Sequence, residues 1–169
     1  MSPKESLLVV LQRENAVTRR VLERAPEGKF AWQPHPKSMS LGRLATHIAE
    51  LAGFGAMVLR LPELEISARD YKPRIAASQR ELLDLFDGEC RKTSTALAAA
   101  SDAALEQVWT LRDGEKVIFQ MPRLAALRAI ALRHTIHHRG QLTVYLRLND
   151  VPVPSIYGPT ADEPVQTLQ

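Results

Sequence analysis

The sequence lacks the features that mark several familiar classes of protein. It has one cysteine, Cys90, among 169 residues, so no intramolecular disulfide can form, and a reducing compartment is expected. No stretch approaches the ~20 apolar residues of a membrane span. The first apolar run ends at Arg13 and Glu14, too early for a secretory signal. We therefore expect a cytoplasmic protein with no membrane partner.

Aromatic residues and charge clusters are also scarce. Aromatics make up only 5% of the chain, so the core must be built mostly from Leu, Ala, Ile and Val. The 22 basic and 19 acidic residues are interspersed and leave a net charge of +3. Without a basic stripe interleaved with aromatics, we expect no nucleic-acid partner. A chain of 169 residues is long enough for one well-packed domain, which we expect to span residues 1–169.

Four segments carry apolar residues at helical spacing. They are residues 3–24, the stretch between Ser40 and Pro62, residues 75–100 and residues 123–149. Ser40 is a favourable N-cap, and Pro122 suits the first turn of the last helix. Four helices joined by connections of uneven length predict an all-α fold, a four-helix bundle with long crossover connections.

The connections between these helices differ in character. Residues 61–74 predict a loop. Residues 108–122 place Asp113 and Gly114 between apolar residues, which predicts a small hairpin or an irregular excursion between the third and fourth helices. The tail, residues 151–164, contains too many proline and glycine residues for a regular helix.

The last helix contains a dense group of histidines, in the stretch LRHTIHHRGQL. Its apolar residues follow steps of three and four, and His134 and His138 fill the gaps in that series, so both are expected to face the core. Being four residues apart, the two imidazoles stack on one helical face, ~5–6 Å from each other. The apolar residues expected to face inward are Leu124, Leu127, Ala131, Leu142, Tyr145 and Leu148.

A third histidine is expected at the same place. His47 lies between Leu44 and Leu51 on the inward stripe of the second helix. His47, His134 and His138 would then offer three imidazole nitrogens to one interior point. Three histidine ligands are typical of a metal site that keeps a position open for water or substrate. His137 is one residue off the stripe and is expected at its edge, as a hydrogen-bond partner of a ligand or exposed to solvent.

Two other interpretations remain open at this point. A buried histidine that binds no metal needs its own hydrogen-bond partner, since an unsatisfied buried polar group costs ~1–3 kcal/mol. Alternatively, the helical phase is different and the histidine-rich stretch faces water.

The residues also carry a family resemblance. The stretches LGRLATHIAEL and LRHTIHHRGQLTVYLRLNDVPVPSIYG resemble the DinB-like superfamily of bacterial four-helix bundles, which includes YfiT-type proteins and the mycothiol- and bacillithiol-dependent transferases. The resemblance spans essentially the whole chain. It implies a divalent metal ion, commonly zinc or nickel, held by His47, His134 and His138, and it implies a homodimer.

Four further residues are candidates near such a site. Gln141 and Tyr145 lie one and two turns beyond the ligands and either touch a substrate or simply pack. Trp32 either covers the bundle end near the metal or fills the core, and core filling is the commoner role of an aromatic. Glu50, one turn after His47, is a candidate general base or hydrogen-bond acceptor, although a surface carboxylate is the commoner outcome.

Three other residues carry simpler expectations. Gly140 is costly inside a helix unless it allows close backbone approach, so it predicts tight helix packing near the metal. Arg139 is expected to point away from the site and to pair with a carboxylate. Cys90 is expected to be an inert core thiol rather than a nucleophile.

A metal ion on three histidines supports two kinds of chemistry on a small-molecule substrate: it can acidify bound water, or it can bind a thiol as thiolate and deliver it to an electrophile. The resemblance favours the second, a metal-dependent transferase that uses a low-molecular-weight thiol. A hydrolase would need a general base, and the sequence predicts no inward carboxylate beside the ligands. The third alternative is a metal-binding bundle without turnover, and the sequence assigns no catalytic residue.

Overall fold

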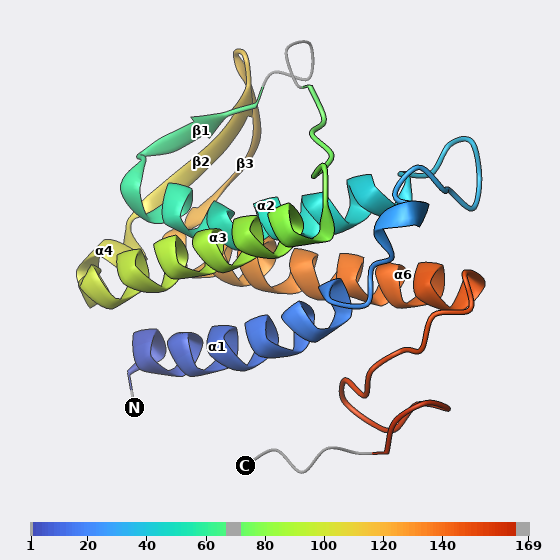
Figure 1. Cartoon of the computed structure of the whole chain (residues 1–169). Coiled ribbons are helices and arrows are strands. Elements are labelled where there is room, and N and C mark those ends of the chain that lie inside the picture. Colours follow the sequence, from blue (N-terminus) through green and yellow to red (C-terminus); the bar gives the residue numbers. More distant parts are fainter. Residues whose placement is uncertain (1, 67–71, 165–169) are drawn as a thin grey trace.

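A computed structural model describes residues 2–66 and 72–164 of the chain (Figure 1). The described residues form four long helices that run side by side, as the sequence predicts. The first three are α1 (Pro3–Leu22), α2 (Leu41–Arg60) and α3 (Gln79–Ala99). The fourth is a continuous helix made of α5 (Arg123–Ala126), a π-helical segment η2 (Leu127–His134) and α6 (Thr135–Leu148). The short helices η1 (Glu27–Lys29) and α4 (Asp102–Glu106) lie in the connections.

Serine side chains fix where the helices begin. Ser2 caps α1 in a reciprocal capping box with Glu5, and Ser40 caps α2 as predicted. The predicted start of the third helix at residue 75 is wrong by one turn. Ser78 accepts a hydrogen bond from the Glu81 backbone and starts α3 at Gln79, which leaves Ile75 outside the helix and 49% exposed.

Helix α2 lies at the centre of the bundle. Small and aliphatic residues bury nearly all of its surface against α3, η2 and α6. The core divides into two clusters along its length. One gathers around Leu44, Ile48 and Phe86, and the other gathers around Leu51, Leu127 and Trp109. His47 lies on α2 between Leu44 and Ile48, both of the first cluster, and one turn before Leu51 of the second.

A small sheet beyond the carboxyl end of α2 corrects the all-α prediction (Figure 1). The predicted hairpin is confirmed: β2 (Val108–Asp113) pairs antiparallel with β3 (Lys116–Pro122), and Gly114 takes a positive φ of 57° in the turn. Buried Trp109 and Leu111 attach it to the bundle.

The loop predicted for residues 61–74 contains an additional strand. In it, β1 (Glu63–Glu65) pairs parallel with β2. The prediction missed this strand because a stretch of three residues is too short to show a period of its own. Residues 67–71 of that loop lie outside the described residues.

The π-helical segment changes the phase of the last helix. In a π-helix each hydrogen bond reaches back five residues instead of four, so the inward-facing position falls later along the chain. In this helix the buried residues after Ala131 are accordingly Thr135, Arg139, Leu142 and Leu146. Leu148, which the sequence predicts to be inward, is 58% exposed. His134 and His138 therefore lie at the flank of the buried stripe, partly exposed, instead of in the core.

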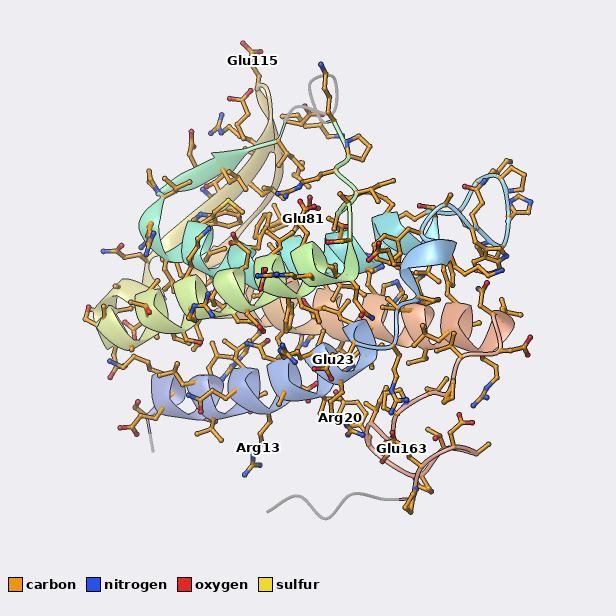
Figure 2. The ribbon with its side chains drawn as sticks, in the orientation of Figure 1. Arg13, Arg20, Glu23, Glu81, Glu115 and Glu163 are labelled. Atoms are coloured by element: carbon orange, nitrogen blue, oxygen red, sulfur yellow. The ribbon has the colours of Figure 1, made fainter. Side chains whose placement is uncertain are left out.

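The irregular tail is held to α1 and α6 by ion pairs. Glu163 lies beside Arg20 (Figure 2) and pairs with it at 2.5 Å. Glu163 also pairs with Arg24 at 2.9 Å, and its Oε2 atom accepts a hydrogen bond from the Ser155 backbone N–H. Asp162 binds Arg147, and that hydrogen bond lowers the pKa of the Asp162 carboxyl. Residues 151–164 thus have no regular secondary structure, as their prolines predict.

None of the helices within residues 2–66 and 72–164 is long and apolar enough to cross a membrane.

Two glycines give a first testable prediction. A Cβ on Gly55 would lie 2.5 Å from Thr93 Cγ2, and Thr93 cannot turn away freely because its hydroxyl donates to Ala52 O and accepts from Ala56 N. We expect Gly55→Ala to lower the free energy of unfolding by about 1–3 kcal/mol in urea titrations.

Gly140 provides the matched control. A Cβ on Gly140 meets no heavy atom within 4 Å, so the predicted close packing at this glycine is wrong. Gly140→Ala should stabilise the protein by about 0.5–1 kcal/mol, because alanine restricts the unfolded chain and favours the helix. Equal effects of the two substitutions would contradict the packing described for Gly55.

Candidate metal centre

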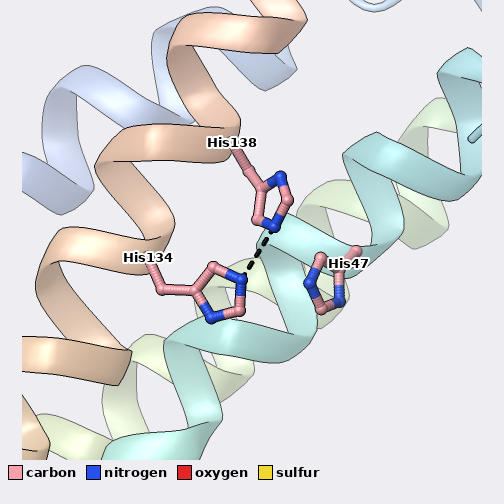
Figure 3. Close-up of side chains that lie close together, drawn as sticks. All are labelled: His47, His134 and His138. Atoms are coloured by element: carbon pink, nitrogen blue, oxygen red, sulfur yellow. Dashed lines mark hydrogen bonds between the residues drawn. The ribbon is translucent and has the colours of Figure 1, made fainter. Parts of the chain in front are cut away.

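Three histidines meet between α2 and the last helix. His47 comes from α2, His134 ends the π-helical segment, and His138 lies one turn later on α6 (Figure 3). One ring nitrogen from each lies within 4.8 Å of the other two. The ring centroids of His134 and His138 are 4.6 Å apart, and that of His47 is 5.4 Å and 4.8 Å from them. The structure thus brings together the three residues that the sequence analysis selected.

Burial keeps these imidazoles in the neutral form. Desolvation lowers the pKa of His47 from 6.5 to about 4, with smaller contributions from electrostatic repulsion by His138, Arg43 and His134. Desolvation is also the main reason that the pKa values of His134 and His138 lie below their ordinary value. A histidine binds a metal ion through the lone pair of its neutral ring. At neutral pH all three rings are therefore in the form that a metal ion requires.

Gln141 sets the tautomer of His138. The Gln141 Oε1 atom lies 2.6 Å from His138 Nδ1, and an amide oxygen only accepts, so Nδ1 carries the proton. The Nε2 atom of His138 is then a lone-pair acceptor, and it lies 2.8 Å from His134 Nε2 (Figure 3). Gln141 therefore points the lone pair of His138 at the centre of the histidine group, which is the role of a hydrogen-bond partner behind a metal ligand.

A carboxylate also lies beside the group, and the structure favours the first of the two alternatives given for Glu50, a position near the histidines, over an ordinary surface position. Glu50 Oε2 is 3.8 Å from His47 Nδ1 and accepts a hydrogen bond of 2.9 Å from Arg43 Nη2. Arg43 is only 7% exposed and was not selected by the sequence analysis. Its position four residues before His47, on the same helical face, is the signal that would have found it.

The remaining candidates lie at the edge of the group or away from it. His137 is exposed, with its ring centroid 5.0 Å from that of His138. The Tyr145 hydroxyl donates to the Met39 carbonyl at 3.2 Å. The ring centroids of Tyr145 and Trp32 are 5.5 Å apart in a T-shaped arrangement, so these two aromatics pack against each other at the bundle end. Burial raises the pKa of Cys90 to about 12, which keeps it a protonated thiol, as predicted.

The donor set leaves room for a non-protein ligand. Within the part of the chain that the structure describes, the group contains three protein ligand atoms and no fourth. Zinc in structural sites is held by four protein ligands, whereas catalytic sites use three and keep one position for water or substrate. The number of candidate ligands therefore corresponds to that of catalytic sites.

The lowered histidine pKa values predict how the metal-free protein responds to acid. Between pH 6.5 and about 4 an unfolded chain binds a proton at His47 that the folded chain does not, so folding becomes less stable as the pH falls. From pH 7 to pH 5 this one residue should remove about 2 kcal/mol. Urea unfolding in EDTA at the two pH values measures the loss.

The matched comparison is His47→Asn, which cannot take up that proton. Its stability should fall less than that of the wild type over the same pH interval. If both lose the same free energy, His47 is not held neutral by burial.

The family model described as the DinB family matches residues 1–167 of the chain. YrdA of Bacillus subtilis strain 168 is 27% identical over 153 residues, which are 89% of this chain and 85% of YrdA. YjoA of the same strain is 27% identical over 133 residues, 78% of this chain and 80% of YjoA. Both are described as uncharacterised.

Two solved structures share the fold. A DinB-like protein from Bacillus cereus superposes with a TM-score of 0.70 at 24% identity, over 90% of this chain and 97% of that one. The DinB-like YjoA from Bacillus subtilis superposes with a TM-score of 0.65 at 22% identity, over 88% and 96% of the two chains.

Proposed function

Because the chain belongs to the DinB family, we propose that it is a metal-dependent enzyme whose divalent ion is held by His47, His134 and His138. The observation that carries the proposal is the convergence of three neutral imidazoles from two helices, with ligand nitrogens within 4.8 Å of one another. Zinc and nickel are the ions we favour, since imidazole is a good ligand for both. Magnesium and calcium prefer carboxylate and carbonyl oxygens, which this group of three histidines does not provide.

The residues present fit such an ion. The two Nε2 atoms of His134 and His138 face each other at 2.8 Å, a contact that uses one ring proton. With an ion in place of that proton, His134 and His138 would hold it through their Nε2 lone pairs. Gln141 then continues to hold the Nδ1 proton of His138, which keeps the ring oriented.

We propose transfer of a low-molecular-weight thiol to a small electrophile as the reaction. When bound, the ion would supply Lewis acidity, which lowers the pKa of a thiol beside it. The sulfur electron pair forms a C–S bond with the electrophilic carbon, the leaving group departs with its bonding pair, and the proton passes to solvent. The three histidines hold the ion, and this reaction needs no separate general base.

A metal-dependent hydrolase is the second candidate, and one observation favours it. Glu50, 3.8 Å from His47 Nδ1, places a carboxylate nearer to the histidines than the sequence predicts. Hydrolysis requires a base that accepts a proton from metal-bound water. Glu50 is engaged by the guanidinium of Arg43, however, and it lies on the Nδ1 side of His47. We therefore rank hydrolysis below thiol transfer.

The test is a turnover assay on tag-free protein loaded with zinc or with nickel. Bacillithiol, mycothiol, glutathione and coenzyme A are each offered with monochlorobimane, and a panel of activated esters is offered without thiol. Turnover that needs one thiol, and that disappears both in chelator and in His134→Ala, supports the proposal. Ester cleavage without thiol supports the hydrolase. A metal-loaded protein inactive in every assay supports a metal-binding bundle without turnover.

A further inference from the structure

Three polar side chains form a row on one face of α2 beside the histidine group. They are Arg43, His47 and Glu50, which follow one another at steps of four and three residues and so share a helical face. Arg43 is only 7% exposed, yet it is an ion that must stay charged. Its Nη1 atom donates to the Arg74 carbonyl at 3.0 Å and its Nη2 atom donates to Glu50 Oε2 at 2.9 Å. The Glu50 carboxylate is thus fixed in place by a buried guanidinium.

The pair faces one particular nitrogen of His47. Nδ1 lies 3.5 Å from Arg43 Nη2 and 3.8 Å from Glu50 Oε2. An ion pair therefore already occupies the Nδ1 side of His47, and its nearer member, the Arg43 guanidinium, would oppose a cation on Nδ1. Nε2 has no such neighbour among the contacts described and is the nitrogen of His47 suited to a cation.

The tautomer of His47 depends on whether its Nδ1 atom forms a hydrogen bond with Arg43 or with Glu50. Arg43 only donates, so a bond to it would leave the ring proton on Nε2 and block that nitrogen. Glu50 only accepts, so a bond to it requires the proton on Nδ1 and frees the Nε2 lone pair. The Arg43 contact, at 3.5 Å, is at the outer limit of a hydrogen bond, whereas the Glu50 contact, at 3.8 Å, is beyond it. A hydrogen bond between Glu50 and His47 Nδ1 therefore requires the carboxylate and the ring to approach each other when a cation takes the Nε2 lone pair.

We propose that Glu50, held by Arg43, is the positioning residue that accepts the Nδ1 proton of His47 and so directs its Nε2 atom at the metal ion. His138 already has this arrangement, with Gln141 as the acceptor at 2.6 Å. The inference rests on the proposed metal site, and it adds that Glu50 orients the third ligand, His47. Loss of such a partner typically weakens metal affinity by 10–100-fold.

The experiment measures zinc affinity by competition with a chromophoric chelator in the wild type and in Glu50→Gln. Glutamine has nearly the same shape but a neutral, weaker acceptor, so we expect about 10–100-fold weaker binding. Glu89→Gln is the matched control. Glu89 belongs to α3 and packs over Gly53 of α2, the helix that carries Glu50, but it pairs with Lys92 at 2.6 Å. Its substitution should leave zinc affinity within about twofold.

A spectroscopic readout separates positioning from a general effect on folding. In zinc-loaded wild type, the long-range ¹H–¹⁵N spectrum should show His47 as the Nδ1–H tautomer with a hydrogen-bonded, slowly exchanging proton. In Glu50→Gln that proton should exchange faster, while the His138 signals stay unchanged. Thermal unfolding in EDTA checks that both variants fold.

The outcomes distinguish the two proposals. If the wild type binds no zinc, the metal site itself is wrong. If the wild type binds zinc and Glu50→Gln binds it equally well with an unaltered His47 Nδ1–H signal, the role given to Glu50 is overturned while the metal site stands.

Discussion

Replacing His134 with alanine is expected to weaken zinc binding by at least about 100-fold, since it removes one of three ligands. His134 also contacts His138 directly, so its loss leaves the Nε2 atom of His138 without its partner at 2.8 Å. The remaining pair, His47 and His138, cannot by itself satisfy the four-coordinate geometry that zinc prefers. Titration of metal-free protein with Co²⁺, followed by its visible absorption bands and then by zinc displacement, measures the loss.

The control for this prediction is His137→Ala. His137 is exposed and neighbours His138, but it is outside the group of converging nitrogens. Its substitution should leave zinc affinity within about threefold, as expected for a residue that does not hold a ligand. Equal losses in the two variants would mean that the histidines bind metal as an unspecific surface cluster.

The second large effect is expected at Arg139, on the opposite flank of α6. Arg139 is 1% exposed and joins three parts of the chain: Nη1 lies 2.7 Å from Glu14 Oε2 and donates to Thr18 at 3.1 Å, while Nη2 donates to Tyr157 at 2.6 Å. The Tyr157 hydroxyl donates in turn to Glu14 at 2.7 Å. Removing one partner of a buried ion pair typically costs 3–5 kcal/mol, because the other charge is left uncompensated.

Arg139→Met should therefore lower the free energy of unfolding by about 3–5 kcal/mol in urea. The control is Arg80→Met, which removes a side chain that is 91% exposed and should change stability by less than about 0.5 kcal/mol. A loss at Arg139 no larger than at Arg80 would show that the network contributes nothing to folding. Zinc affinity of the folded Arg139 variant should be unchanged, because the guanidinium faces α1 and not the histidines.

The predictable part of the fold was local. Apolar periodicity, with the Ser40 cap for α2 and Pro122 for the last helix, located α1, α2 and the last helix, and Asp113-Gly114 marked the hairpin. The start of α3 was placed a turn early, because Ile75 fits the periodicity but lies before the Ser78 cap. The strand β1 depends on pairing with β2, a contact between distant segments that short-range patterns do not contain.

The sequence predicts which histidines form the group, but it does not predict how deeply His134 and His138 are buried. Helical spacing brought together His47, His134 and His138, and the structure places them side by side. A straight α-helix, however, would have turned His134 and His138 into the core. The π-helical segment turns Thr135 and Arg139 inward and leaves the histidines half-buried at the flank. Such a segment is set by tertiary packing and has no sequence signature of the kind that caps provide.

X-ray absorption at the zinc edge of tag-free, zinc-loaded protein tests the central claim most directly. The histidine group predicts three nitrogen scatterers at ~2.0–2.1 Å with imidazole multiple scattering, plus one light atom from solvent. On addition of a thiol that supports turnover, one sulfur scatterer should appear at ~2.3 Å and replace the light atom. Fewer than three imidazoles per zinc, or a fourth protein ligand that no thiol displaces, would contradict an open three-histidine site.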